Sequence, residues 1–185
     1  MAFTQVQKLQ LNHQVDRILH VPGNFQGGNL EMTMVFDYDA ETDWFKEKAG
    51  QIITALKAHS PVFRNVRFHA VKWKGDFSIT NHTIPMTFVQ TGRFFEEDGM
   101  DIPLNAGITE EKKEINNIKN LEVLLENLKL FHARSKLILV LTQGQYQISD
   151  KEVAKKALNP FLKQKMLLLG PDYMKTGMEI FMELI

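Results

Sequence analysis

Apolar residues along the chain alternate between strand-like and helix-like patterns. Short runs rich in β-forming residues occupy 30–36, 65–73, 84–90 and 166–169, and each predicts a strand. Pro85 near the start of one run places that strand at a sheet edge. The run 136–142, Lys-Leu-Ile-Leu-Val-Leu-Thr, is continuously apolar after its lysine, which is typical of a strand buried on both faces of a parallel sheet.

Segments in which apolar residues recur at helical spacing lie between these strands. Asp43 is a suitable N-cap for a first helix, and Ser149 with Glu152 has the spacing of a capping box for a third. Pro160 should kink or shorten that third helix, and the last ten residues predict a final one. The three apolar faces are Phe45, Ala49, Ile52, Ile53 and Leu56; Leu121, Leu124, Leu125, Leu128 and Phe131; and Val153, Ala154, Ala157, Leu158 and Phe161.

The order of these elements predicts the fold class. Strands alternating with helices indicate an α/β three-layer sandwich with a mostly parallel central sheet and one antiparallel edge strand, formed by residues 30–185. Residues 1–29 are polar, and the alternation within 6–11 predicts an N-terminal strand and loop extension. Ligands of such sheets bind at the carboxyl ends of the strands, where loops 37–43, 91–117 and 143–149 would gather.

The amino-acid composition excludes several classes of function. The chain has 185 residues, 22 basic against 22 acidic, and no cysteine. This length suits one domain, and the neutral balance argues against a nucleic-acid binder. The lack of cysteine excludes a disulfide framework, a thiolate zinc site and a thiol nucleophile. The start has no signal-peptide pattern and no apolar run approaches the length of a membrane span, so we expect a cytoplasmic protein without membrane contact.

Three segments carry a family resemblance. An apolar strand runs into Asp37-Tyr38-Asp39-Ala40-Glu41, a second strand and hairpin occupy 65–76, and 137–145 reads Leu-Ile-Leu-Val-Leu-Thr-Gln-Gly-Gln. Together they resemble the von Willebrand factor type A domain over about residues 30–170. The resemblance implies a metal-ion-dependent adhesion site, in which an Asp, two hydroxyls, a central-loop Thr and a later Asp surround a divalent ion.

Departures from that pattern alter the expected site. Asp37 matches the first Asp, whereas Asp39 and Glu41 stand where two serines would be, and Gln143 replaces the later Asp. The central loop near Asn120 offers no Thr. The usual site is therefore not expected, but Asp37, Asp39 and Glu41 could hold Mg²⁺ or Ca²⁺ through oxygen ligands. The alternative is a solvated acidic turn that caps the next helix.

The resemblance suggests a non-catalytic protein–protein interaction module with a degraded or altered cation site. Its partner face would include Asn120, Gln143, Asp98 and Asp101, and the clustered acid favours a partner with a basic segment. The alternative is a divalent-metal-dependent phosphate-ester hydrolase that uses Asp37 and Asp39. Such an enzyme needs a downstream lysine and further acid at strand ends, and Lys136, which precedes its strand, does not meet that need.

The histidines, serines, methionines and lysines of the chain are more consistent with structural roles than with catalysis. The six histidines lack metal-ligand spacing, and His69 is expected in the core. No serine lies in a nucleophile elbow. Met174, Met178 and Met182 are spaced i, i+4 and i+8, which predicts a core stripe or, alternatively, an adaptable partner surface. The lysines of the third helix region form either a solvated face or a patch for an acidic partner; they are Lys151, Lys155, Lys156, Lys163 and Lys165.

Overall fold

A computed structural model describes residues 5–19, 28–37, 63–76, 78–83, 89–90, 118–144, 146–170 and 173–185. The predicted helix at 43–56 and the predicted loop at 91–117 lie outside these residues. The described elements, in chain order, are α1 (Gln5–Leu19), β1 (Gly28–Asp37), β2 (Phe63–Gly75), β3 (Ser78–Thr83), β4 (Val89–Gln90), α5 (Leu121–Phe131), β5 (Leu137–Leu141), α6 (Lys151–Ala157), the kinked segment η2 (Leu158–Leu162), α7 (Lys163–Lys165), β6 (Met166–Leu169), β7 (Met174–Thr176) and α8 (Gly177–Glu183).

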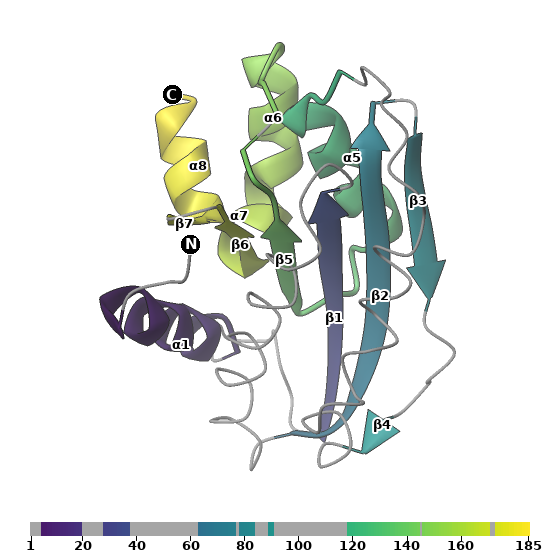
Figure 1. The fold of residues 1–185 in the computed structure, drawn as a ribbon, viewed down its shortest axis with the longest axis vertical. Helices are drawn as coiled ribbons and strands as arrows, with labels where there is room; N and C mark the ends of the chain where they lie inside the picture. The colour runs from purple at the N-terminus through teal and green to yellow at the C-terminus, as the bar shows by residue number, and fades with distance from the viewer. Residues whose placement is uncertain are drawn as a thin grey trace.

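A mixed, mostly parallel sheet forms the centre of this α/β fold (Figure 1). Its strands follow the order β3-β2-β1-β5-β6-β7, and β4 pairs additionally with β2. The pairs β1–β2, β1–β5 and β5–β6 are parallel. Both β3 and β7 run antiparallel to their neighbours, so each end of this order carries an antiparallel strand, whereas the sequence predicted only one.

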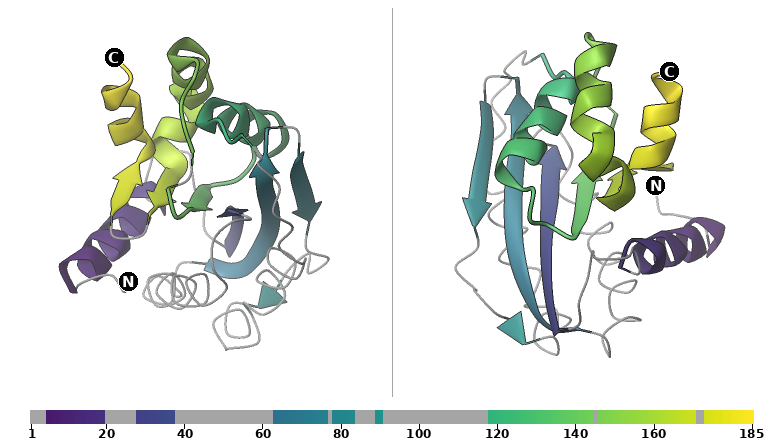
Figure 2. Two further views of the ribbon diagram at one scale, coloured as in Figure 1. Left: turned by 45° about the horizontal axis from the view of Figure 1, so that its top comes forward. Right: turned by 180° about the vertical axis from the view of Figure 1, so that it is seen from behind.

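One sheet face is covered by α5, α6 and α8, which lie side by side in Figure 2. Alternate strand residues such as Val35, Val71 and Val140 meet the leucines of α5 in one buried cluster. Because side chains of a strand alternate between faces, a strand such as β5 with five buried residues must be covered on both sides. The continuous apolar run of 137–141 is thereby explained.

The N-terminal segment forms a helix where the sequence suggested a strand. Within α1, Leu11, Val15, Ile18 and Leu19 are buried at i, i+4, i+7 and i+8, a helical period that overrides the short alternation at 6–11. The helix packs against β5 and β7, on the side of the sheet away from α5 and α6 (Figure 2).

The C-terminal elements depart from the sequence prediction at one helix cap and follow it in two other details. The N-cap of α6 is Asp150, whose side chain accepts from the Val153 amide, and not Ser149. Asn159, immediately before Pro160, has the extended angles φ −107° and ψ 130°, so the helix breaks there as the proline predicted. The last ten residues contain the predicted final helix, α8, which a capping box of Thr176 and Glu179 starts at Gly177.

The methionine stripe predicted as a core element is wrong. Met174 belongs to β7, and Met178 and Met182 of α8 are 37% and 60% exposed. These two methionines lie on one side of α8, while Ile180 and Leu184 on the other side are buried.

The described helices include none that is long and apolar enough to cross a bilayer.

Candidate functional site

Asp37 ends β1 at the point where the order of strands reverses. In the sheet β1 has β2 on one side and β5 on the other, and Asp37 is in register with Trp73 of β2. Chain connections leave in opposite directions from such a point, which opens a crevice at the carboxyl ends of the strands. Lys119 precedes α5 and Thr142 follows β5, so three distant segments meet here.

The Asp37 carboxylate is bound by an ammonium and a hydroxyl. Lys119 Nζ donates to one oxygen in an ion pair, and Thr142 Oγ1 donates to the other at 2.7 Å. The side chains of both Asp37 and Lys119 are only 1% exposed. A buried charge is tolerated only when it is paired and hydrogen-bonded, so Lys119 balances the charge of Asp37 from within the chain.

Aromatic rings lie beside this ion pair. Lys119 Nζ is 5.8 Å from the centroid of the buried Trp73 ring, and the Tyr146 ring centroid lies 5.9 Å from that of Trp73. Burial, and secondarily the neighbouring Tyr173, raises the pKa of the Tyr146 phenol, so this hydroxyl stays protonated at neutral pH. A small pocket of about 330 Å³ reaches the cluster from outside and is lined by Ile118, Lys119, Gly144, Tyr146 and Gln147.

Gly144 shapes the loop after β5. Its φ of +89° lies in the left-handed region, which glycine adopts without steric cost. In this conformation its amide donates to Thr142 Oγ1 at 3.0 Å. The hydroxyl of Thr142 thus accepts from Gly144 and donates to Asp37, which fixes the direction of its hydrogen atom.

The loop before α5 is held to the β2–β3 turn. The backbone amide of Asn120 donates to Asp76 Oδ1 at 2.7 Å, and its side-chain amide donates to Asp76 Oδ2 at 2.5 Å. The Asp76 amide in turn donates to the carbonyl of Ile118 at 3.0 Å. This exchange places Lys119 at a fixed distance from the end of β1.

The same loop is also held to the segment before α6. Leu121 N donates to the Gln147 carbonyl at 2.8 Å, and Gln147 N donates to the Lys119 carbonyl at 2.9 Å. The buried Glu122 carboxylate accepts from the amides of Ser149 at 3.2 Å and Asp150 at 2.9 Å. The described strand-end loops therefore form a connected polar network, which is a preorganised surface.

The structure places some of the predicted site residues at the strand ends, and others lie outside the described residues. Asp37 is at the strand end as expected, but its carboxylate faces Lys119. Asn120 is turned to Asp76 and accepts from Ser149 Oγ at 2.5 Å, and Gln143 is partly exposed. Asp39, Glu41, Asp98 and Asp101 lie outside the described residues. Among the residues that are described, no group of three or more His, Asp or Glu side chains could hold a metal ion.

Sequence reasoning missed Lys119, the residue closest to the expected ion position. The resembled family places a metal-binding Thr near 117–120, and this chain has a lysine in that loop. No periodicity marks a loop lysine as buried, because lysine is almost always exposed. The sequence did contain one indication of this contact. Asp37 follows an apolar strand, and Lys119 lies in the loop that is expected to face the end of that strand.

A second polar cluster lies at the opposite end of β1, on the side covered by α5. His69 Nε2 is 3.0 Å from Glu31 Oε2, and the rings of His69 and His132 are 5.4 Å apart. The pKa of His132 is lowered from 6.5 to about 4, chiefly by burial and next by His69, while Glu31 acts in the opposite direction. His69 is nearly buried in agreement with its predicted core position.

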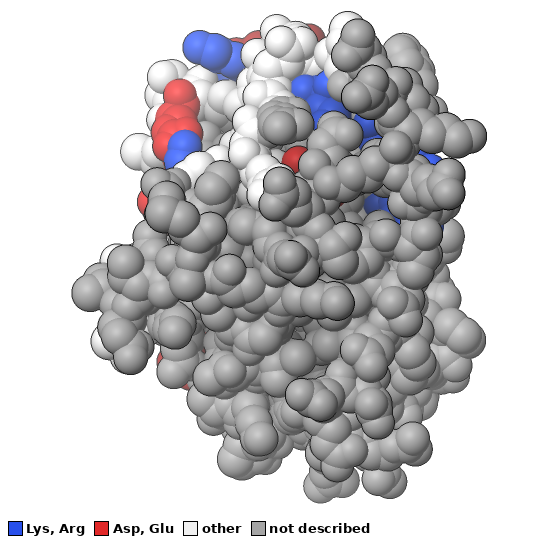
Figure 3. Space-filling model, in the orientation of Figure 1, with Lys and Arg blue, Asp and Glu red and all other residues white. Residues whose placement is uncertain are grey.

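Charged side chains of both signs occupy the described surface near the strand ends in Figure 3. Comparison with known proteins adds no further guide: no protein-family model, no curated protein and no solved structure matches this chain. The Asp37 cluster and the loops around it are therefore the features that indicate a function.

Proposed function

We propose that this chain is a non-catalytic protein-binding module that resembles the von Willebrand factor type A domain and works without a divalent ion. The observation that carries the proposal is the buried ion pair of Asp37 and Lys119. In the resembled family a metal ion balances the first Asp of the site. An ammonium attached to the chain can balance that charge permanently, and Thr142 retains the role of a hydroxyl partner.

Rigid loops support a binding role. The network of Asp76, Asn120 and Glu122 fixes the described loops before any partner arrives, and preorganisation lowers the entropic cost of association. Acid at Asp39, Glu41, Asp98 and Asp101 favours a partner with a basic segment, because opposite charges steer the encounter. The proposed partner face is the carboxyl end of the sheet.

The first experiment measures the melting temperature with Mg²⁺, Mn²⁺ and Ca²⁺. The wild-type protein should show no ion-dependent rise, because Lys119 already neutralises Asp37. Lys119→Ala removes the ammonium beside Asp37, and this variant should melt lower and regain part of the loss with increasing ion concentration. A wild-type rise that disappears in Asp37→Asn would contradict a metal-free site.

The second experiment addresses the partner face. Asp39→Asn with Glu41→Gln should weaken capture of a native partner, and a chelator should leave wild-type capture unchanged. Glu126→Gln, an exposed carboxylate halfway along α5 and outside the strand-end hydrogen-bond network, is the matched control. Equal capture by the wild type and the double variant would exclude this face as the binding surface.

One observation favours a second candidate, a phosphate-ester hydrolase. Such an enzyme needs a lysine near its strand-end carboxylate, and Lys119 supplies one where Lys136 could not. Asp37, Lys119 and Thr142 would then be a carboxylate, a cation and a hydroxyl around a phosphoryl group. Hydrolysis of p-nitrophenyl phosphate with Mg²⁺, abolished in Asp37→Asn, would support this alternative and exclude the non-catalytic one.

A further inference from the structure

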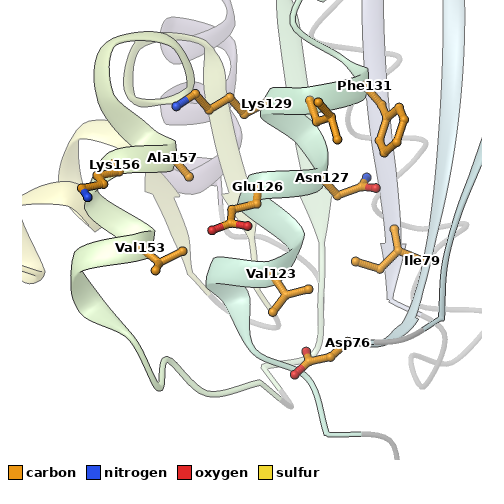
Figure 4. A pocket seen from close by; sticks show the side chains of 11 residues that line it. Asp76, Ile79, Val123, Glu126, Asn127, Lys129, Phe131, Val153, Lys156 and Ala157 are labelled. Atoms are coloured by element: carbon orange, nitrogen blue, oxygen red, sulfur yellow. The ribbon is translucent and has the colours of Figure 1, made fainter.

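The β2–β3 hairpin is held to α5 at two separate places. At the strand ends, the Asp76 carboxylate accepts from the backbone amide and the side-chain amide of Asn120. Farther along α5, Asn81 of β3 and Asn127 exchange two amide hydrogen bonds, with Nδ2 to Oδ1 distances of 3.1 and 2.9 Å. A groove of about 900 Å³ lies over α5, and Figure 4 shows Ile79 of β3 in its lining, between Asp76 and Asn127. The groove wall formed by β3 is therefore held to α5 by hydrogen bonds at two points.

His132 is hydrogen-bonded to the second of these places. It is the C-cap of α5, and its Nε2 lies 2.7 Å from Asn81 Oδ1. A carbonyl oxygen only accepts, so Nε2 carries the hydrogen atom and Nδ1 has a lone pair. Nδ1 is buried, and no described residue offers it a hydrogen-bond partner. His132 is only 5% exposed whereas Asn81 is exposed, so the histidine is the buried member of this cluster.

The charged groups that face His132 come from the two strands beneath α5. Glu31 of β1 and both Arg67 and His69 of β2 lie on the sheet face that α5 covers. Glu31 Oε2 lies 3.0 Å from His69 Nε2, and Glu31 Oε1 lies 4.0 Å from a guanidinium nitrogen of Arg67. The ring centroids of His69 and His132 are 5.4 Å apart. Both oxygens of the Glu31 carboxylate thus have partners on β2. Further cations follow along the chain at the end of α5 and after it; they are Lys129, Arg134 and Lys136.

We propose that Asn81, Asn127 and His132 form an acid-sensitive clasp between β3 and α5, which opens when His132 takes up a proton. Protonation places a charge and a second donor, Nδ1–H, in a buried position without an acceptor, and this is costly. The cost is avoided when the imidazole turns to water, which withdraws Nε2 from Asn81. The exposed amide pair of Asn81 and Asn127 is then left alone, and a single exposed pair contributes little. The last turn of α5 and the facing part of β3 separate, while Asp76 still holds Asn120.

The direction of the pH dependence follows from the two forms of the clasp. In the closed form the pKa of His132 is lowered from 6.5 to about 4 by burial and next by His69, while Glu31 acts in the opposite direction. In the open form the imidazole contacts water and regains its ordinary pKa. Between pH 6.5 and 4 the open form therefore binds a proton that the closed form does not. The clasp is tightest above pH 6.5 and loosens as the pH falls.

Hydrogen exchange of the full chain from pH 4.5 to 7.5 tests the proposal, with each amide rate divided by its intrinsic rate. A local opening exposes little surface, so its exchange does not respond to low urea concentrations, whereas exchange through global unfolding does. The last turn of α5, including the His132 amide that donates to the Leu128 carbonyl, should show such urea-independent exchange. Its opening equilibrium should rise about tenfold for each unit of pH from 6.5 down to 4.5. A local opening that does not change with pH would overturn the proposal.

Three variants separate the histidine from the amide pair. His132→Gln keeps a side-chain amide that can donate to Asn81 but takes up no proton, so its opening equilibrium should not change with pH. Asn127→Ala should raise the opening equilibrium about threefold or more at every pH. His13→Gln, at an exposed position of α1, is the matched control and should keep the wild-type pH slope. A His132→Gln variant with the wild-type slope would overturn the proposal.

An NMR titration of the wild-type His132 ring gives a readout that needs no folded variant. The ring should titrate well below pH 6.5 while the last turn of α5 is still protected. Titration of His132 at its ordinary pH in the folded chain, with that protection intact, would show that the clasp accommodates the proton without opening and would overturn the proposal.

Discussion

The Asp37 carboxylate and the Lys119 ammonium form an ion pair across 82 residues of chain, and both side chains are almost completely buried. Such a pair gives little net stability when it is intact, because desolvation offsets the attraction. Removing one partner is costly, because it leaves an uncompensated buried charge. The pair therefore enforces one arrangement of the strand-end loops more than it stabilises the fold.

Lys119→Met and Asp37→Asn should each lower the free energy of unfolding by about 3–5 kcal/mol. The double variant should lose much less than the sum of the two, because neither residue then lies buried opposite a missing partner. Urea denaturation of the four proteins measures the coupling. Lys151→Met, at an exposed lysine, should remain within about 0.5 kcal/mol of the wild type. Additive losses would mean that the two residues act independently.

Thr142→Val should cost about 1.5–3 kcal/mol of unfolding free energy, because the Asp37 carboxylate loses a donor and the Gly144 amide loses its acceptor. Thr142→Ser keeps the hydroxyl and should recover most of the loss. The matched control is Thr80→Val on β3, where the threonine is exposed. Thermal unfolding compares all three. A Thr142→Val variant as stable as the wild type would show that the hydroxyl contributes nothing to holding Asp37.

Glu122→Ala should destabilise the start of α6, because the amides of Ser149 and Asp150 lose their acceptor. We expect a loss of about 1–3 kcal/mol, and Glu122→Gln should retain part of the stability through its carbonyl oxygen. Hydrogen exchange of the α6 amides localises the effect. Glu126→Ala, at an exposed position of the same helix, should leave that exchange unchanged. Faster exchange spread evenly over the sheet would contradict a local role.

Stability should fall as the pH is lowered between about 6.5 and 4. His132 has a pKa of about 4 in the folded chain against 6.5 for the unfolded residue, so over this window the unfolded state binds a proton that the folded state does not. The contribution is on the order of 3 kcal/mol and is fully present above pH 6.5. Urea midpoints measured from pH 4 to 7.5 test this.

His132→Gln should flatten the pH profile in that window, since the group that titrates is gone. His13→Gln, on an exposed position of α1, should leave the wild-type slope in place. If the His132→Gln variant keeps the full wild-type slope, His132 is not the source of the pH dependence.

Local patterns predicted much of the described fold. The continuous run of β5, the leucine spacing of α5 and the break before Pro160 each have a cause within a few residues of sequence. The polar segment that becomes α1 carries a helical signal in Leu11, Val15 and Ile18, but the two-residue alternation at 6–11 competes with it and favours a strand. The antiparallel direction of β7 depends on tertiary pairing with β6, which no local pattern encodes.

The candidate site was predictable only in part. Asp37 could be placed because a carboxylate after an apolar strand lies at the carboxyl end of the sheet. Its partner Lys119 could not be placed, because an ion pair between distant segments produces no periodic pattern in the sequence. The density of carboxylates in the first loop suggested an external cation, whereas the observed cation belongs to the chain itself.

The contact between α1 and β7 also constrains how the protein can be made. α1 leaves the ribosome before any of the described strands, whereas β7 is among the last elements synthesised. Until β7 has emerged, the apolar side of α1, with Leu11, Val15 and Ile18, therefore has only part of its final packing surface available. The sheet edge at β7 and the packing of α1 are therefore completed together, as a late step in the formation of the fold.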